Sequence, residues 1–280
     1  MLAIAVQLEL NDLYVNKEWE ELAQRPEIAD HPDWVLELAN NKDLWVRETI
    51  AQNPVMAFFP EIAAKIADGG DWEVRANLAC NPAIADLPGI AAKLAGDIET
   101  WVRVHLVENS ALFDLPEVVE KLTDDPNLEV RKYIARNPAI ANLPEIMTKL
   151  ANDNHWVVRA HLAVNPAIAN LPEIMTKLAS DGDWKVRATL ARNSGIARFP
   201  EIAHRFTNRK ISTKIRKALA KNPAIADFPD VVEKLRNDPS ASVRSSIARN
   251  SAVASLKQLP ASDLHQTQTH SPRSPSLQEN

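Results

Sequence analysis

A short motif recurs through most of the chain at a nearly constant spacing. An arginine that follows valine or isoleucine stands at eight positions, separated by 28 residues five times, then by 29, then by 28. Six residues after each arginine comes an asparagine, and seven residues after most of these asparagines comes a proline. A fixed period of this length is typical of a repeat architecture. The repeat arginines are Arg47, Arg75, Arg103, Arg131, Arg159, Arg187, Arg216 and Arg244.

Each repeat is predicted to contain two short helices. In the fifth repeat, Val158 and Leu162 follow helical spacing. That helix is predicted to end near Asn165, because the residue before a proline disfavours helical backbone. A second helix is predicted to begin at Pro172, since proline is favoured in the first turn. Stacked repeats bury apolar faces that a single repeat cannot, so we predict an all-α fold, an α-solenoid (superhelix) of about eight 28-residue two-helix repeats.

The repeat pattern divides the chain into four predicted segments. Residues 1–35 are predicted to form an N-terminal cap and a partial repeat, residues 36–250 the α-solenoid, and residues 251–259 a C-terminal cap. Residues 260–280 are rich in serine, threonine, glutamine and proline, which is typical of a disordered tail. No apolar run reaches the roughly 20 residues of a membrane helix, and a lone cysteine fits a reducing compartment. We therefore expect no membrane partner and a cytoplasmic location.

Charge is distributed unevenly along the chain. The net charge is −5, yet residues 1–125 contain 24 acidic and 9 basic side chains. Residues 185–221 contain 11 basic side chains and one acidic side chain. A charged surface attracts partners of the opposite sign. The N-terminal part is therefore predicted to favour a basic partner, and the segment 185–221 an acidic one.

The repeat resembles that of the leucine-rich repeat variant family, a branch of the HEAT-like helical repeats. The resemblance rests on an Asp-x-x-Val-Arg-x-x-Ile-Ala-x-Asn-Pro stretch followed by Pro-Glu-Ile-x-x-Lys-Leu-Ala, parts of which stand at Asp183 to Arg187 and at Asn222-Pro223. It covers about residues 20–250, with repeats slightly longer than the family's. The resemblance implies a binding scaffold without a fixed reaction. The iron–sulfur cluster of the founding member is not implied, because Cys80 is the only cysteine.

The recurring polar residues are interpreted first as structural. The repeat arginines are expected to bond an aspartate, an asparagine or a carbonyl group of an adjacent repeat, and the asparagines to end helices. The second helices carry a basic column in which most members follow an acidic residue by four positions. Such pairs stabilise a helix, so the column is predicted to be neutralised within each helix. Its members are Lys65, Lys93, Lys121, Lys149, Lys177, Arg205 and Lys234.

Partner binding is expected at positions that differ between repeats. The position two residues after the repeat arginine is polar or aromatic in four successive repeats, as Asn77, His105, Tyr133 and His161. Stacked repeats would align these side chains as a stripe that recognises a peptide or protein; an ordinary solvated face is the other interpretation. Five tryptophans precede repeat arginines and are interpreted as packing between repeats. Trp45 and Trp101 stand one position later than the other three, which predicts greater exposure and a contact role.

No catalytic, cofactor or metal site is predicted. The sequence contains none of the common nucleophile, zinc-protease, phosphate-loop or dinucleotide motifs. His105 and His161 are two repeats apart, roughly 20 Å by the spacing of packed helices, whereas zinc ligands lie about 2 Å from the metal. The leading prediction is therefore a non-enzymatic scaffold that binds a protein or peptide.

Nucleic-acid binding through residues 185–221 is the alternative. A DNA-repair activity is one form of it, since some HEAT-like solenoids are DNA glycosylases, although the fold alone does not fix a function. HEAT-like repeats also occur in bilin-attaching lyases. Phosphate contacts would come from basic side chains, and binding would weaken steeply with salt. These residues are Arg192, Arg198, Arg205, Arg209, Lys210, Lys214, Lys217 and Lys221.

Overall fold

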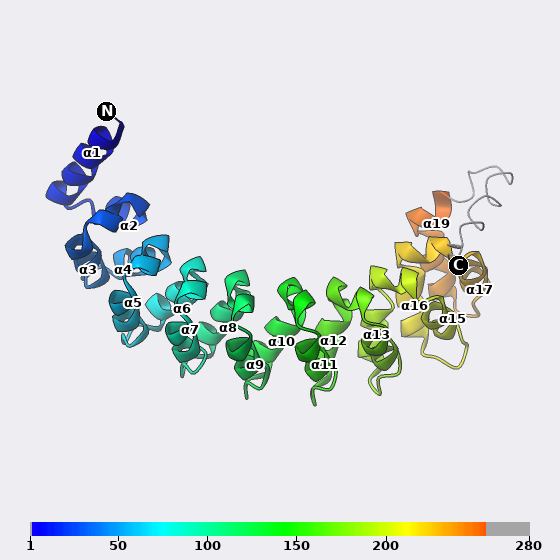
Figure 1. Ribbon diagram of the computed structural model, residues 1–280. Helices are drawn as coiled ribbons and strands as arrows, with labels where there is room; N and C mark the ends of the chain where they lie inside the picture. The colour runs from blue at the N-terminus through cyan, green and yellow to red at the C-terminus, as the bar shows by residue number, and fades with distance from the viewer. Residues whose placement is uncertain (1, 256–280) are drawn as a thin grey trace, which may run out of the picture. The chain divides into compact units, whose positions relative to one another are not determined.

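A computed structural model describes residues 2–255, with side chains described for residues 4–254. Within that range the chain forms α-helices, short 3₁₀ helices and turns, and no strand (Figure 1). It divides into two compact units, an N-terminal unit of Met1–Leu178 and a C-terminal unit of Ala179–Asn280. The tail predicted for residues 260–280 and the end of the cap predicted for residues 251–259 lie outside the described residues. No helix in the described range is both long and apolar enough to cross a membrane.

Each complete repeat consists of a first α-helix, a 3₁₀ helix and a second α-helix; α18 is a first helix that is followed, in the described residues, by α19 alone. The first helices are α2 (Trp19–Gln24), α4 (Leu44–Gln52), α6 (Trp72–Cys80), α8 (Thr100–Glu108), α10 (Leu128–Arg136), α12 (Trp156–Val164), α14 (Trp184–Leu190), α16 (Thr213–Ala220) and α18 (Ala241–Ala248). The 3₁₀ helices are η1 (Pro26–Asp30), η2 (Pro54–Phe58), η3 (Pro82–Asp86), η4 (Ser110–Asp114), η5 (Pro138–Asn142), η6 (Pro166–Asn170), η7 (Ser194–Arg198) and η8 (Pro223–Asp227). The second helices are α3 (Pro32–Ala39), α5 (Pro60–Ala67), α7 (Pro88–Leu94), α9 (Pro116–Thr123), α11 (Pro144–Leu150), α13 (Pro172–Ala179), α15 (Pro200–Phe206) and α17 (Pro229–Arg236). Outside the repeats lie α1 (Leu2–Asn16) and α19 (Ser251–Ser255).

Local sequence explains where these helices begin and end. Asp43 accepts a hydrogen bond from the backbone N–H of Trp45 at 2.9 Å and so caps α4. Asn81 ends α6, and its side-chain oxygen accepts a hydrogen bond from the backbone N–H of Ala83 at 2.9 Å, which caps η3. The second helices all begin at a proline, as the sequence predicts.

Apolar side chains from all three helices of a repeat meet in the core. In one repeat, Val158, Leu162, Ile168 and Leu178 are fully buried. Within the N-terminal unit the first helices α4, α6, α8, α10 and α12 pack side by side in chain order (Figure 1). Within the C-terminal unit α14, α16 and α18 pack in the same way. This sequential packing of two-helix repeats confirms the predicted α-solenoid.

Asparagine side chains join consecutive repeats, a role that the sequence did not predict. Asn81 is 1% exposed, and its Nδ2 donates to the carbonyl oxygens of Ala51 and Asn53, both at 2.8 Å. These carbonyls lie 30 and 28 residues earlier in the chain, and the same offsets recur at Asn53, Asn109, Asn165 and Asn250. Because buried carbonyl groups require a donor, this asparagine ladder fixes how neighbouring repeats stack.

The ends of the described range continue the same register. Asn53 bonds the carbonyls of Ala23 and Arg25, so α2, η1 and α3 form a repeat that precedes the first Val-Arg pair. The segment boundary predicted at residue 35 therefore lies inside α3 (Pro32–Ala39). Helix α1 packs against α2, and α19 packs against α18 and η8.

Candidate functional site

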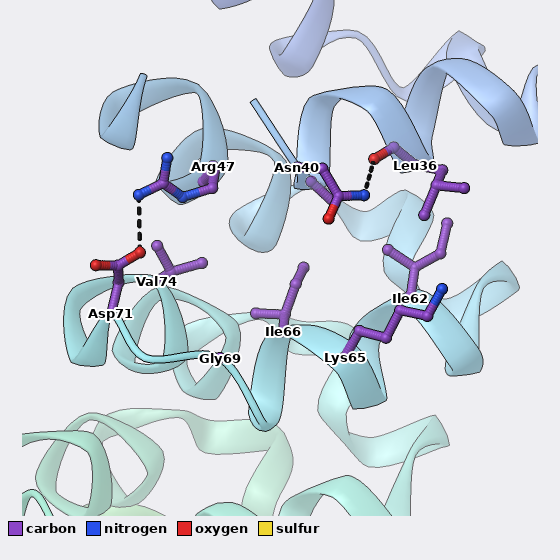
Figure 2. A pocket seen from close by; sticks show the side chains of 10 residues that line it. Leu36, Asn40, Arg47, Ile62, Lys65, Ile66, Gly69, Asp71 and Val74 are labelled. Carbon is purple, nitrogen blue, oxygen red and sulfur yellow. Dashed lines mark hydrogen bonds and ion pairs between the residues drawn. The ribbon is translucent and has the colours of Figure 1, made fainter. Parts of the chain in front are cut away.

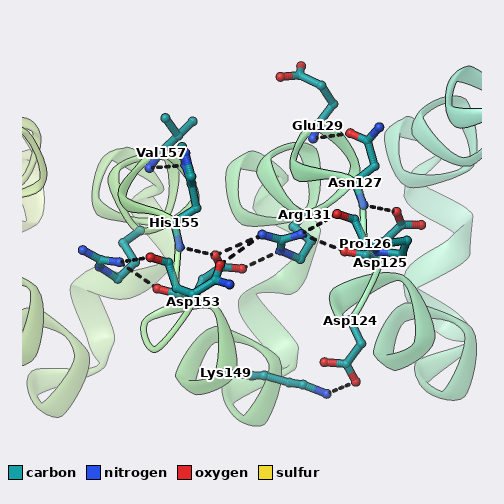
Figure 3. Close-up of polar contacts among 12 residues, drawn as sticks. Asp124, Asp125, Pro126, Asn127, Glu129, Arg131, Lys149, Asp153, His155 and Val157 are labelled. Carbon is teal, nitrogen blue, oxygen red and sulfur yellow. Dashed lines mark hydrogen bonds and ion pairs between the residues drawn. The ribbon is translucent and has the colours of Figure 1, made fainter.

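The repeat arginines form a series of ion pairs between consecutive repeats, which we call the arginine–aspartate ladder. Arg103 is 9% exposed, and its Nε and Nη2 donate to the two carboxylate oxygens of Asp125 at 2.6 and 3.1 Å. Its Nη1 donates to the carbonyl oxygen of Asp97 in the loop before its own helix, at 2.6 Å. Figure 3 shows the same arrangement at Arg131. Further pairs of this series are Arg47–Asp71, Arg75–Asp97, Arg131–Asp153 and Arg216–Asp238, and Arg159 is not without a partner.

The structural interpretation of the arginine column is therefore confirmed, and the ladder shifts the acidity of its members. Burial raises the pKa of Asp97, but hydrogen bonds from Arg75 and from the backbone N–H of Glu99, together with the charges of Arg75 and Arg103, outweigh it. The pKa of Asp97 consequently lies below its ordinary value. The hydrogen bond to Asp97 likewise raises the pKa of Arg75. Both groups stay charged at neutral pH, so the ladder arginines are occupied by the protein itself.

Two lysines of the basic column on the second helices are neutralised between repeats rather than within their own helix. Lys93 pairs with Asp68, and Lys149 pairs with Asp124 at 2.5 Å; both carboxylates belong to the preceding repeat. The prediction of pairing within the helix is wrong for Lys149, which follows Glu145 by four positions, because stacking brings the end of the preceding second helix within reach. No such pair is predicted for Lys93, because Gly89 stands four positions before it. Lys234 pairs as predicted, with Asp230 four residues earlier at 3.6 Å.

One face of most first helices is at least partly accessible, and we call it the outer stripe. It consists of the residues two before, two after and five after the repeat arginine, a spacing that places them on one side of a helix. On α16 and α18 the middle residue of the three, Ala218 and Ser246 respectively, is buried. On α8 these residues are Trp101, His105 and Glu108, of which the first and last are exposed and the middle one is half-buried. The predicted stripe of polar residues and the two displaced tryptophans therefore belong to the same surface.

Indole and carboxylate groups alternate along the first row of the outer stripe in the N-terminal unit. The residue two before the repeat arginine is Trp45 on α4, Glu73 on α6, Trp101 on α8 and Glu129 on α10, and we call these four the Trp–Glu row. Trp45 and Trp101 are 57% and 50% exposed, against 37% for Trp72. Within residues 2–255 their indole N–H groups form no hydrogen bond, and Glu73 forms no ion pair. The middle of this row therefore has free recognition groups.

A lysine of the chain itself occupies the end of the row. Lys132 forms an ion pair with Glu129, and its Nζ lies 5.1 Å from the centroid of the Tyr133 ring. A cation held between a carboxylate and an aromatic face is thus already present on α10. The corresponding space between Glu73 and the neighbouring tryptophans holds no such cation among the described residues.

The four polar residues of the predicted stripe lie on adjacent first helices and are all half-buried. Asn77 accepts a hydrogen bond from the Gln52 side chain and donates to the carbonyl oxygen of Glu73 at 2.9 Å. The Nδ1 of His161 lies 2.8 Å from the carbonyl oxygen of Val157. Their hydrogen-bonding groups are partly used within the fold, and a contact with a partner stays a prediction for them. The residues are Asn77, His105, Tyr133 and His161.

Cys80 lies against His105, with 3.2 Å between Sγ and Nδ1. Burial, assisted by the negative charge of Glu108, raises the pKa of the Cys80 thiol. A thiol of raised pKa stays protonated at neutral pH and is a poor nucleophile. Among residues 2–255, no group of three or more histidine, cysteine or acidic side chains is arranged to hold a metal ion.

The outer stripe of the C-terminal unit is basic. Its exposed members include Arg192, Lys214 and Lys221, and helices α14, α16 and α18 contain no acidic residue. The Nζ of Lys214 lies 4.0 Å from the centroid of the Trp184 ring. The other predicted phosphate contacts lie beside the stripe or away from it. Lys217 adjoins it on α16, Arg198 ends η7, Arg205 lies on α15, and Arg209 and Lys210 lie in the loop before α16.

A hollow of about 140 Å³ opens between two repeats of the N-terminal unit (Figure 2). Ile62, Ile66 and Val74 line it, and its polar neighbours are already bonded. Asn40 donates to the carbonyl oxygen of Leu36 at 2.7 Å, and Arg47 donates to Asp71 at 2.7 Å. The hollow therefore offers little polar chemistry to a ligand, and the outer stripe is the better candidate site.

Comparison with known proteins finds similarity to solved structures of repeat proteins, at low sequence identity. No protein-family model and no curated protein matches the sequence. Among solved structures the chain is similar to YibA of E. coli, with a TM-score of 0.42 and 15% sequence identity over 87% of this chain and 96% of that one. It is also similar to a designed armadillo repeat protein, with a TM-score of 0.26 and 16% identity over 79% of this chain and 98% of that one. At these TM-scores, the assignment of an α-solenoid rests on the helix packing described above.

Proposed function

We propose that this protein is a non-enzymatic scaffold that binds a basic peptide in an extended conformation along the outer stripe of its N-terminal unit. The alternation of exposed indole groups with half-buried glutamates in the Trp–Glu row is the observation that carries the proposal. The strongly acidic composition of residues 1–125, with 24 acidic and 9 basic side chains, would draw such a peptide to this unit.

The chemistry of the row suits lysine or arginine side chains. A cation over a tryptophan ring is worth about 0.5–2 kcal/mol, more as water is excluded. Trp45 and Trp101 each offer an exposed ring, and Glu73 lies between them with a carboxylate that has no partner in the described residues. Lys132, held between Glu129 and Tyr133, exemplifies the contact that we assign to the peptide.

The spacing of the row predicts the spacing of basic residues in the peptide. Packed helices lie about 8–10 Å apart, and an extended chain advances about 3.3 Å per residue. One step along the row therefore corresponds to about three residues of peptide. We expect one basic side chain of the peptide to contact Trp45. A second, about three peptide residues further along, should contact Glu73, and a third, about three residues beyond that, should contact Trp101.

Other features support a scaffold without catalysis. The raised pKa of Cys80 disfavours a thiolate nucleophile. The repeat motif supports membership of the leucine-rich repeat variant family, which we propose on the resemblance of the sequence. The single cysteine supports a reducing, cytoplasmic setting.

Selection from a library of random 15-residue peptides tests the main proposal. We expect the selected peptides to carry lysine or arginine at intervals of about three residues, given the helix spacing. The affinity of the best peptide, measured by fluorescence anisotropy, should fall about tenfold or more in the Trp45→Ala/Trp101→Ala variant, because two cation–π contacts are lost. Glu73→Gln should weaken binding in the same direction.

Phe58 provides a matched control, because it is an aromatic residue outside the row and is 72% exposed. Phe58→Ala should bind the selected peptide as tightly as the native protein. Selected peptides without basic residues, or equal affinities for the native protein and the double tryptophan variant, would contradict the proposal.

A second candidate function is nucleic-acid binding by the C-terminal unit. The specific observation in its favour is the absence of acidic residues from α14, α16 and α18, combined with exposed Arg192, Lys214 and Lys221. Binding of a single-stranded oligonucleotide should weaken steeply between about 50 and 200 mM salt. Lys214→Glu/Lys221→Glu should abolish it, whereas Lys234→Glu on α17 should not. No binding at low salt would remove this candidate.

A further inference from the structure

Among the described residues, two repeat arginines of the C-terminal unit lack the carboxylate partner that defines the arginine–aspartate ladder. Arg244 is the last repeat arginine and bonds only two carbonyl oxygens of the loop before its own helix, whereas Arg187 is followed by a further repeat. Arg187 on α14 is half-buried, and its Nη1 donates to the carbonyl oxygen of Asp181, as its counterparts do in their own loops. Its Nε and Nη2 form no hydrogen bond or ion pair within the part of the chain that the structure describes. In Arg216 the same edge donates to Asp238 at 2.7 and 3.3 Å.

The sequence of the next repeat explains the missing partner. That repeat follows the 29-residue spacing, and the chain contains no acidic residue between Glu201 and Asp227. The place of the ladder aspartate, 22 residues after Arg187 or six before Arg216, falls to Arg209 or Lys210. Both side chains are exposed. A carboxylate has therefore been replaced by positive charge at this one step of the ladder.

A further cation contacts the face of α14 that carries Arg187. Lys214 on α16 reaches back to α14, where its Nζ lies 4.0 Å from the centroid of the Trp184 ring. Trp184 and Arg187 are three residues apart on α14 and so share a face. The unpaired nitrogens of Arg187 are accessible to solvent. Among the described residues, Arg25 Nε is the one buried side-chain nitrogen or oxygen atom without a hydrogen-bond partner, so the unpaired nitrogens of Arg187 are not buried.

We propose that the open edge of Arg187 binds a phosphate group of a nucleic-acid strand. Two phosphate oxygens would take the positions that carboxylate oxygens hold at the other ladder arginines, because a guanidinium edge binds either group with two parallel hydrogen bonds. Arg209, Lys210 and Lys214 supply the surrounding positive charge. This inference rests on the second candidate function and gives it a defined phosphate site.

A nucleic acid fits this surface better than a phosphopeptide does. Exposed cations also stand on the outer stripe of this unit, five residues after each of its three repeat arginines, as Arg192, Lys221 and Arg249. A row of charges over three repeats matches a polymer with a phosphate at every residue, whereas a phosphopeptide offers one or two phosphates.

Thermal unfolding with inorganic phosphate tests the site without a nucleic acid. At constant ionic strength, replacing chloride by phosphate should raise the Tm of the native protein, because a ligand that binds the folded state stabilises it. Arg187→Gln should lose this response, and the matched charge removal Lys234→Gln should keep it. Arg209→Asp or Lys210→Asp should restore the ladder, raise the Tm without phosphate and abolish the response. The proposal is overturned if phosphate does not raise the Tm of the native protein. It is also overturned if phosphate raises the Tm of Arg187→Gln equally, which would mean an adventitious ion only.

Binding assays with a single-stranded oligonucleotide and with a phosphopeptide separate the site from the function. Arg187→Gln should weaken oligonucleotide binding roughly tenfold, the usual effect of losing hydrogen bonds to a charged group. Tighter binding of the phosphopeptide than of the oligonucleotide overturns the assignment to nucleic acid. If Arg187→Gln leaves oligonucleotide binding unchanged, the phosphate site at Arg187 is refuted, whereas nucleic-acid binding by the C-terminal unit is still supported. If phosphate raises the Tm through Arg187 but no oligonucleotide binds, the phosphate site is supported and the nucleic-acid function is refuted.

Discussion

Replacing Asn81 by alanine tests whether the asparagine ladder holds consecutive repeats together. Asn81 is 1% exposed and makes three hydrogen bonds, donating to Ala51 and Asn53 at 2.8 Å and accepting from Ala83 at 2.9 Å. Each such bond contributes about 1 kcal/mol net, and a buried carbonyl left without its donor costs about as much again. Asn81→Ala should therefore lower the free energy of unfolding by about 3–5 kcal/mol.

Urea denaturation followed by circular dichroism measures this change, and hydrogen exchange locates it. Protection should fall first at the junction of α4, η2 and η3, because repeats unfold with their nearest neighbours. Asn152→Ala is the matched control, since Asn152 is exposed and donates only to the Thr148 carbonyl one turn earlier. It should change the unfolding free energy by less than about 0.5 kcal/mol. Equal effects of the two substitutions would refute the role of the ladder.

Three further predictions concern the buried charges and the thiol. Because the pKa of Asp97 is depressed in the folded protein, its stabilising contribution is present above the unfolded value of about 3.9 and is lost as the pH falls through the folded pKa; urea midpoints from pH 6 to pH 2 should fall less steeply for Asp97→Asn. Arg103→Lys should cost about 2–3 kcal/mol in unfolding free energy, because lysine cannot reproduce the paired hydrogen bonds to Asp125, and an unchanged midpoint would contradict this. Iodoacetamide should alkylate Cys80 more slowly at pH 8 than it alkylates a free cysteine, because burial raises the pKa of that thiol; equal rates before and after unfolding in urea would count against the prediction.

Much of the fold could be predicted because the repeat fixes it. The period and the prolines predict two-helix repeats and the start of every second helix. The displaced register of Trp45 and Trp101 predicts their greater exposure, which the structure has. The ladder partners were harder to predict, since aspartates stand both four and six residues before repeat arginines and only the stacking distance selects between them.

The candidate site was only partly predictable. The Trp–Glu row follows from reading one helical position across successive repeats, a comparison that the sequence allows. The bonds from Asn81 to backbone carbonyls leave no trace in the sequence, because any residue supplies a carbonyl group. The pairing of Lys149 with Asp124 was missed because the spacing rule for one helix does not describe contacts between helices.

The bonds of both ladders join residues of neighbouring repeats that are separated by constant numbers of residues. Asn81 bonds residues 28 and 30 positions earlier, and Arg75 bonds a residue 22 positions later. A gene segment encoding one whole period could therefore be duplicated or deleted internally, and every surviving asparagine and most arginines would still find an equivalent acceptor. The 29-residue spacing keeps the asparagine bonds by lengthening the offsets to 29 and 31 at Asn222. Evolution, or an engineer, can thus change the length of this protein in whole modules while leaving the bonding scheme of each module intact.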